Sequence, residues 1–208
     1  MKNLRTEVFE NDSIRFYSQN AARYASDTMK LDMGEVYPHF LSHIAPGGKI
    51  LDAGCGSGRD SLYFSRQGYS VTPFDASKEM CKEASKRLRF PVLQMRFEEL
   101  EYDAVFDGAW ACASLVHTPW AKQEPVIRKL LHALKPGGAL YAAASATWMK
   151  REPQKSSAGW VRSDCWNNGS RSARKAPSRN GSTSSFKKGD CAVCDTNFER
   201  MMPSVLEL

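Results

Sequence analysis

The sequence has no long hydrophobic run. No segment approaches the roughly 20 apolar residues that a membrane-spanning helix needs. The first residues, 1–7, also have no apolar core of the kind that a secretory signal peptide carries. We therefore expect a cytoplasmic protein with no membrane partner. Its 208 residues fit one domain followed by a tail.

Cysteine is scarce, with six residues in the chain. Cys191 and Cys194 form a Cys-x-x-Cys pair, but the sequence has no second such pair and only Cys165 is near. A structural zinc ion takes four ligands, usually from two matching pairs. We interpret the pair as chance spacing, and we predict free thiols and no metal site.

The positive charge is unevenly distributed. Residues 1–149 hold 18 Lys or Arg against 17 Asp or Glu, whereas residues 150–208 hold 11 against 6. A nucleic-acid-binding domain is usually basic on its own surface. We therefore expect no specific nucleic-acid partner, and only non-specific contact through the basic tail.

Strand-like and helix-like segments alternate up to about residue 145. The strand-like segments are 49–53, 69–74, 91–95, 106–113 and 139–144, and the helix-like segments are 11–25, 33–44, 59–67, 77–88 and 124–134. This alternation is typical of a doubly wound α/β fold, in which helices cover both faces of a mostly parallel sheet. Such sheets bind ligands at the carboxyl ends of their strands.

Residues after about 145 have a different composition. Ser, Arg, Lys, Gly and Asn dominate 150–190 without apolar periodicity. A segment of this kind cannot bury a core. We therefore divide the chain into a domain, 1–145, and a basic low-complexity tail, 146–208, that is disordered or the product of a shifted reading frame.

A glycine-rich loop, Asp52–Gly58, joins the first strand to the next helix. Gly54, Gly56 and Gly58 allow a tight turn and a close approach of backbone to a ligand. Dinucleotide-binding loops have G-x-G-x-x-G, but Arg59 occupies the third glycine position here. Asp52 would repel a phosphate and attract an ammonium group. This pattern favours a cationic nucleoside over a nicotinamide dinucleotide.

A second carboxylate, Asp75, ends the second strand, 17 residues after Gly58. A carboxylate at this place in the fold can accept hydrogen bonds from both hydroxyls of a ribose. Met80 and Phe97 are our candidates for the apolar side chains around the base. Alternatively, both aspartates are ordinary residues at strand ends.

These segments resemble the class I S-adenosylmethionine-dependent methyltransferases, which have a Rossmann-like sheet. The resemblance lies in Ile50–Ser61, whose Gly58–Ser61 is similar to the tellurite-resistance type, and in Gly68–Ser77, Phe106–His117 and Leu134–Leu140. It implies S-adenosyl-L-methionine as the cofactor, held by Asp52, Gly54, Gly56, Gly58 and Asp75. It also suggests that Tyr17 and Tyr24 lie on a helix that closes over the cofactor, although simple helix packing is the alternative.

Members of this family usually end in two further strands that form an antiparallel hairpin. We find neither strand after residue 145 and predict that the hairpin is missing. The outer edge of the fifth strand would then be unpaired, which favours aggregation.

The resemblance implies methyl transfer, a displacement in which the protein mainly aligns the reactants. Ser114 and His117, just after the fourth strand, are the candidates for touching the acceptor, with His117 as general base. The sequence lacks an Asn/Asp-Pro-Pro-aromatic motif and a separate recognition domain, so we expect a small-molecule acceptor. The alternatives are an inactive cofactor-binding homologue and an NAD-dependent oxidoreductase.

Overall fold

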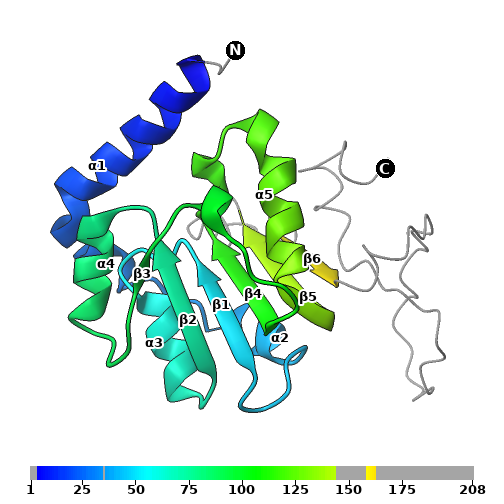
Figure 1. Ribbon diagram of the computed structural model, residues 1–208. Coiled ribbons are helices and arrows are strands. Elements are labelled where there is room, and N and C mark those ends of the chain that lie inside the picture. The colour runs from blue at the N-terminus through cyan, green and yellow to red at the C-terminus, as the bar shows by residue number, and fades with distance from the viewer. Residues whose placement is uncertain (1–3, 35, 144–157, 163–208) are drawn as a thin grey trace.

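The computed structural model describes residues 4–34, 36–143 and 158–162 (Figure 1). Its six-stranded sheet has the order β3-β2-β1-β4-β5-β6, and the first five strands along the chain run parallel. The strands are β1 (Lys49–Ala53), β2 (Ser70–Asp75), β3 (Leu93–Gln94), β4 (Phe106–Cys112), β5 (Leu134–Ala143) and β6 (Ala158–Arg162). The helices are α1 (Leu4–Thr28), α2 (Val36–Leu41), α3 (Arg59–Arg66), α4 (Lys78–Ser85), α5 (Trp120–His132) and the short 3₁₀ helices η1 (Phe97–Glu99) and η2 (Leu115–His117). This arrangement confirms the doubly wound α/β prediction.

The two faces of the sheet bury different side chains. Along β4, Ala109 and Ala111 pack in the cluster that contains the apolar side of α5, whereas Trp110 points to the opposite face and packs with α2 and α3. The alternation follows from the two-residue period of a strand. In Figure 1, α5 lies in front of the sheet and α2 and α3 lie behind it. Both faces are therefore covered, as a parallel sheet requires.

Glycine in β4 permits close packing on the α2 side. A Cβ at Gly108 would lie 2.3 Å from Ile44 Cδ1 and 2.9 Å from Phe40 Cζ. Since no side chain fits there, Gly108 lets the end of α2 approach the sheet directly.

α1 is the longest helix, with 25 residues, and it extends beyond the predicted segment at both ends. It packs mainly against α4, and Ser18 Oγ lies 3.0 Å from Ser77 Oγ at the start of that helix. Ser77 also accepts a hydrogen bond from the Met80 amide and is the N-cap of α4. No helix in the described part of the chain combines the length and the hydrophobicity that crossing a membrane requires.

β5 begins five residues earlier than predicted. Leu134 already pairs with Phe106, and an irregularity follows before Ala139 pairs with Gly108. Gly137, at φ +81°, lies inside that irregularity. The segment 135–138, which lies between the predicted helix and the predicted strand, is therefore an irregularity within the strand.

The expectation that no strand follows residue 145 was wrong. β6 pairs antiparallel with β5, from Ala139 with Arg162 to Ala143 with Ala158, so the outer edge of β5 is covered there. The predicted boundary at residue 145 thus leaves out one strand of the same sheet. The short β6 was hidden in a polar region because it carries little apolar periodicity. The rest of the predicted tail, including the Cys191–Cys194 pair, lies outside the described residues.

Candidate functional site

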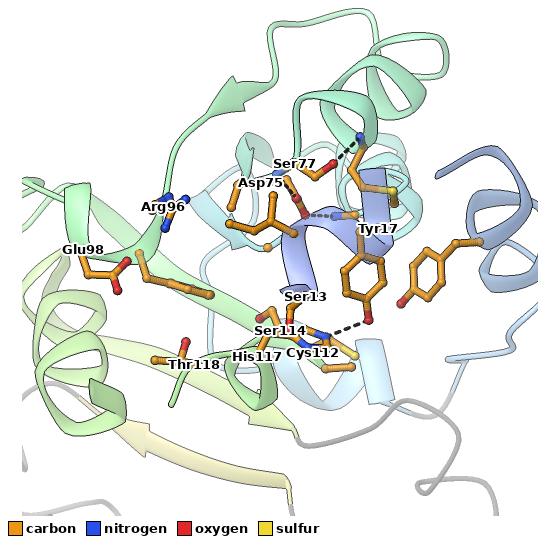
Figure 2. A pocket seen from close by; sticks show the side chains of 18 residues that line it. Ser13, Tyr17, Asp75, Ser77, Arg96, Glu98, Cys112, Ser114, His117 and Thr118 are labelled. Carbon is orange, nitrogen blue, oxygen red and sulfur yellow. Dashed lines mark hydrogen bonds between the residues drawn. The ribbon is translucent and has the colours of Figure 1, made fainter. Parts of the chain in front are cut away.

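A pocket opens at the carboxyl ends of β1, β2 and β4, beneath α1 (Figure 2). It encloses about 790 Å³ when the open solvent at its mouth is included. All predicted site residues line it except Asp52 and Gly58: they are Tyr17, Tyr24, Gly54, Gly56, Asp75, Met80, Phe97, Ser114 and His117. The pocket therefore joins residues from α1, the glycine loop, β2 and the loop after β4.

The glycines of the loop serve three different purposes. Gly54 has φ +79°, and a Cβ there would lie 2.4 Å from Ser114 Cβ, so this glycine lets the loop after β1 contact the loop after β4. Gly56 has φ +54° and faces the pocket, where an added Cβ would lie 3.6 Å from Met80 Cε. Gly58 packs away from the pocket, since a Cβ would approach Ala84 Cβ at 3.1 Å.

The Asp75 carboxylate is held by two backbone amides. Gly56 N donates to Oδ2 at 2.9 Å, and Ser77 N donates to Oδ1 at 2.8 Å. Burial raises the pKa of Asp75, and the two backbone hydrogen bonds oppose that rise. Each carboxylate oxygen retains further acceptor capacity, so a fixed carboxylate can accept two additional hydrogen bonds from a diol.

Asp52 lies behind the wall of the pocket. Its side chain is 2 % exposed and accepts a hydrogen bond from the Ser61 hydroxyl at 2.5 Å. Burial, and next the nearby Asp60 carboxylate, raise the pKa of Asp52 to about 8. In this arrangement Asp52 ties β1 to α3, and its role in binding a cofactor stays a prediction.

A buried network around Asp60 was not predicted. Its carboxylate accepts hydrogen bonds from Arg59 Nε, Tyr37 Oη and Trp110 Nε1, the last at 2.8 Å. These donors fix the first turn of α3 against α2 and β4. The same network holds the Arg59 guanidinium, which also donates to Asp60 Oδ2 at 2.9 Å. The sequence placed Arg59 and Asp60 in the motif, but no pattern connected them to Tyr37 or Trp110.

The loop after β4 combines a strained backbone with a buried hydroxyl group. Ala113 has φ +56°, a left-handed conformation that costs a residue with a Cβ about 1 kcal/mol. Ser114, next in the chain, is 7 % exposed, and its Oγ is buried without a hydrogen-bond partner among the described residues. A strained residue beside an unsatisfied hydroxyl points to a functional place in the fold.

His117 meets Tyr17 across the pocket. Tyr17 Oη and His117 Nε2 are 2.8 Å apart, and the two rings lie edge to face with their centroids at 4.9 Å (Figure 2). Burial lowers the pKa of His117 and raises the pKa of Tyr17. Both groups are therefore neutral near pH 7. Tyr24 lies edge to face with Tyr17 at the same centroid separation.

The remaining lining residues were not predicted from the sequence. They include Ser13 and Ile14 of α1, Arg96 and Glu98 at the start of η1 and within it, Cys112, Ala113 and Thr118 near η2, and Ala76 and Ser77 after β2. A signal was available for most of them, because they directly follow predicted strands or lie one turn before Tyr17 on its helix. Figure 2 draws Arg96 and Glu98 on the side away from Tyr17.

Comparison with known proteins identifies the fold family. Residues 50–138 match the model of a family described as a methyltransferase domain. Over these residues the chain is similar to methyltransferase domains, which supports the predicted class I S-adenosylmethionine-dependent methyltransferase fold. The similarity to the tellurite-resistance type stays a prediction.

Curated relatives support the same methyltransferase domain. Methyltransferase GfsG from Streptomyces halstedii is 32% identical over 109 residues, which cover 48% of this chain and 38% of the relative. A ubiquinone biosynthesis O-methyltransferase from Xanthomonas campestris is 32% identical over 105 residues, 46% of this chain and 42% of the relative. The matched segment thus spans less than half the length of these relatives.

A solved structure supports the fold. The 1,6-didemethyltoxoflavin-N1-methyltransferase of Burkholderia thailandensis aligns with a TM-score of 0.58 over 66% of this chain and 63% of that one, at 22% identity. That protein was crystallised with 1,6-didemethyltoxoflavin and S-adenosylhomocysteine. Because the identity is only 22%, this comparison shows that the two proteins share a fold and nothing more.

Proposed function

We propose that this protein transfers a methyl group from S-adenosylmethionine to a small molecule bound in the pocket. One observation carries the proposal: Asp75, held by Gly56 N and Ser77 N, presents its carboxylate in the same pocket as the open backbone of the glycine loop. This arrangement suits a nucleoside that carries a free ribose diol.

The residues of the pocket fit the parts of the cofactor. Asp75 would accept hydrogen bonds from the ribose hydroxyls, and Met80 and Phe97 would pack against the adenine. Gly54 and Gly56 would bring backbone near the methionine portion, under Tyr17 and Tyr24. The cofactor, when bound, supplies a methyl group already activated on a sulfonium.

The protein would contribute mainly alignment. Ser114 and His117 lie across the pocket from Asp75, where they would contact the acceptor. Correct alignment of two reactants can supply about 7–11 kcal/mol in favourable systems. The unsatisfied Ser114 hydroxyl supports this role, because a bound acceptor would restore its missing hydrogen bond.

Several observations favour a small acceptor in the cytoplasm. The pocket is a concave site lined by side chains from α1, the glycine loop, β2 and the loop after β4, and the cysteines of the described part, Cys55, Cys81 and Cys112, are free thiols. Free thiols fit a reducing compartment. The predicted basic tail, in so far as it contacts nucleic acid, would do so without specificity.

The test is a methyltransferase assay on the whole chain. Incubation with S-adenosylmethionine and a panel of small hydroxyl, amine and thiol compounds should yield S-adenosylhomocysteine in an acceptor-dependent way. Binding of S-adenosylhomocysteine without turnover of any panel member would favour an inactive cofactor-binding homologue. Binding of NAD instead would favour an oxidoreductase and overturn the proposal.

A further inference from the structure

We propose that Tyr17 and His117 act together as a proton-transfer pair, and that the acceptor is a neutral hydroxyl compound methylated on oxygen. This inference rests on the proposed methyl transfer and deepens it. The juxtaposition of Tyr17 Oη and His117 Nε2, 2.8 Å apart on the wall of the pocket, carries it.

The direction of this hydrogen bond follows from the chemistry of the two groups. A buried phenol keeps its proton, and a phenol O–H is a better donor than a neutral imidazole N–H. We therefore infer that Tyr17 donates to His117 Nε2. The imidazole then carries its own proton on Nδ1, the less common tautomer of a neutral histidine.

The surroundings of the pair contain few charges. The titratable or charged side chains that line the same pocket are Tyr24 of α1, Asp75 at the end of β2, Arg96 and Glu98 at the start of η1 and within it, and Cys112 at the end of β4. Asp75 already accepts two backbone hydrogen bonds, and Glu98 pairs with Lys122 at 3.5 Å. In the proposed complex the remaining acceptor capacity of Asp75 is used by the ribose hydroxyls, so neither carboxylate is left to pair with a cationic amine beside His117.

This charge distribution favours an oxygen nucleophile. An ammonium acceptor would lose its hydration without gaining a counter-ion, which is costly in a buried site. A hydroxyl acceptor instead needs a group that takes its proton, and the pair provides one. Ser114, whose Oγ has no hydrogen-bond partner among the residues that the structure describes, lies in the same part of the pocket and would bind a second polar group of the acceptor.

In the proposed reaction, each bond that forms is matched by one that breaks. The acceptor O–H bond breaks as its oxygen forms a bond to the methyl carbon, and the carbon–sulfur bond breaks with its electron pair returning to sulfur. The acceptor proton moves to Tyr17 Oη while the Tyr17 proton moves to His117 Nε2. His117 becomes an imidazolium, which later releases the proton to water.

The first test measures the tautomer of His117 in the whole protein. Nitrogen-15 NMR of histidine-labelled protein, with the signals assigned by their loss in His117→Gln, should show a proton on Nδ1 of His117. Tyr17→Phe should return His117 to the common Nε2–H form. Tyr102→Phe, whose ring packs on Phe106 outside the pocket, is the matched control and should change nothing. A wild-type proton on Nε2, or no change in Tyr17→Phe, would overturn the pair.

The second test addresses the acceptor class. In the presence of S-adenosylhomocysteine, benzyl alcohol, which stays neutral, should bind at least about tenfold more tightly than benzylamine, which is an ammonium ion near pH 7. The pocket offers the ammonium no counter-ion and offers the hydroxyl a hydrogen bond to the pair. Tyr17→Phe should reduce the preference, because it removes that hydrogen bond. Equal binding, or a preference for the amine, contradicts an oxygen acceptor. Failure to bind S-adenosylhomocysteine at all would instead contradict the proposed function. In that case the NMR measurement of the His117 tautomer would still show whether the Tyr17–His117 pair exists.

Discussion

The two sides of the pocket differ in how completely their polar groups are satisfied. On the β2 side, both Asp75 oxygens accept backbone hydrogen bonds, and Ser77 caps α4. On the β4 side, Ala113 is strained and Ser114 Oγ has no partner among the described residues. On the β2 side the polar groups have hydrogen-bond partners before any ligand binds. On the β4 side, a ligand that paired with the Ser114 hydroxyl would remove the cost of leaving it unpaired.

This difference fits the two ligands of a methyltransferase. A side that binds an invariant cofactor can be fixed in advance, because its hydrogen-bond geometry never changes. A side that binds the acceptor gains from unsatisfied groups, since an unpaired buried hydroxyl costs about 1–3 kcal/mol until a ligand pairs it. Stability is thus reduced where specificity is needed.

The largest loss of stability should come from breaking the contact between the two sides. Gly54→Ala would place a Cβ 2.4 Å from Ser114 Cβ at a residue with φ +79°. We expect a loss of about 2–4 kcal/mol in the free energy of unfolding, measured by urea denaturation.

Gly68→Ala is the matched control for Gly54→Ala. Gly68 has φ +87°, but no atom lies within 4 Å of its added Cβ. It should therefore lose only the backbone strain, about 1 kcal/mol. Equal losses in the two variants would mean that the contact between the loops contributes nothing.

Asp52→Asn tests whether the Asp52 carboxyl, which is buried behind the wall of the pocket, is protonated. Because the folded-state pKa of Asp52, about 8, exceeds its ordinary value of 3.8, the folded chain retains a proton that the unfolded chain releases between these two pH values. Wild-type stability should therefore fall as pH rises through this window. The amide of the variant cannot titrate, so Asp52→Asn should gain about 5–6 kcal/mol relative to wild type from the bottom to the top of the window.

Urea denaturation of both proteins at several pH values measures this difference. A constant difference across the window would contradict the raised pKa of Asp52. Binding of S-adenosylhomocysteine provides a second readout. A large loss of affinity in Asp52→Asn would favour the cofactor role that the sequence predicted for this carboxylate.

On the β4 side, where the acceptor would bind, we expect a smaller change in stability of opposite sign. Ser114→Ala removes the unpaired hydroxyl and should stabilise the fold by about 1 kcal/mol. Ser61→Ala is its counterpart, because Ser61 is also fully buried but donates to Asp52, and it should destabilise by about 1–2 kcal/mol. Thermal denaturation compares the two serines. Destabilisation by both would mean that Ser114 has a partner in solution and that the two sides are alike.

Local patterns in the sequence predicted the cofactor side better than the acceptor side. The strand–glycine loop–helix order and Asp75 at a strand end are consecutive or nearly so, and one fold rule brings them together. Tyr17 and His117 are 100 residues apart, so their contact depends on how α1 crosses the sheet. The φ of Ala113 and the missing partner of Ser114 leave no trace in the residue types.

Local sequence patterns were similarly limited in predicting the strands of the fold. Strands with continuous apolar runs, such as β1 and β4, were placed within a residue, whereas β3 is only two residues long and β6 was missed. β6 is fixed by pairing with β5 rather than by its own hydrophobic period. Asp52 was predicted to hold the cofactor because its carboxylate would attract an ammonium group. Its side chain accepts a hydrogen bond from Ser61, and the cofactor role stays a prediction.

Calorimetric titration with S-adenosylhomocysteine tests most directly whether Asp75 holds the cofactor. The wild-type chain should bind S-adenosylhomocysteine and not NAD. Asp75→Ala should bind it at least about 30-fold more weakly, whereas Asp103→Ala, at a side chain 77 % exposed, should leave the affinity unchanged. Equal affinity in wild type and Asp75→Ala, or tighter binding of NAD than of S-adenosylhomocysteine, would contradict this assignment.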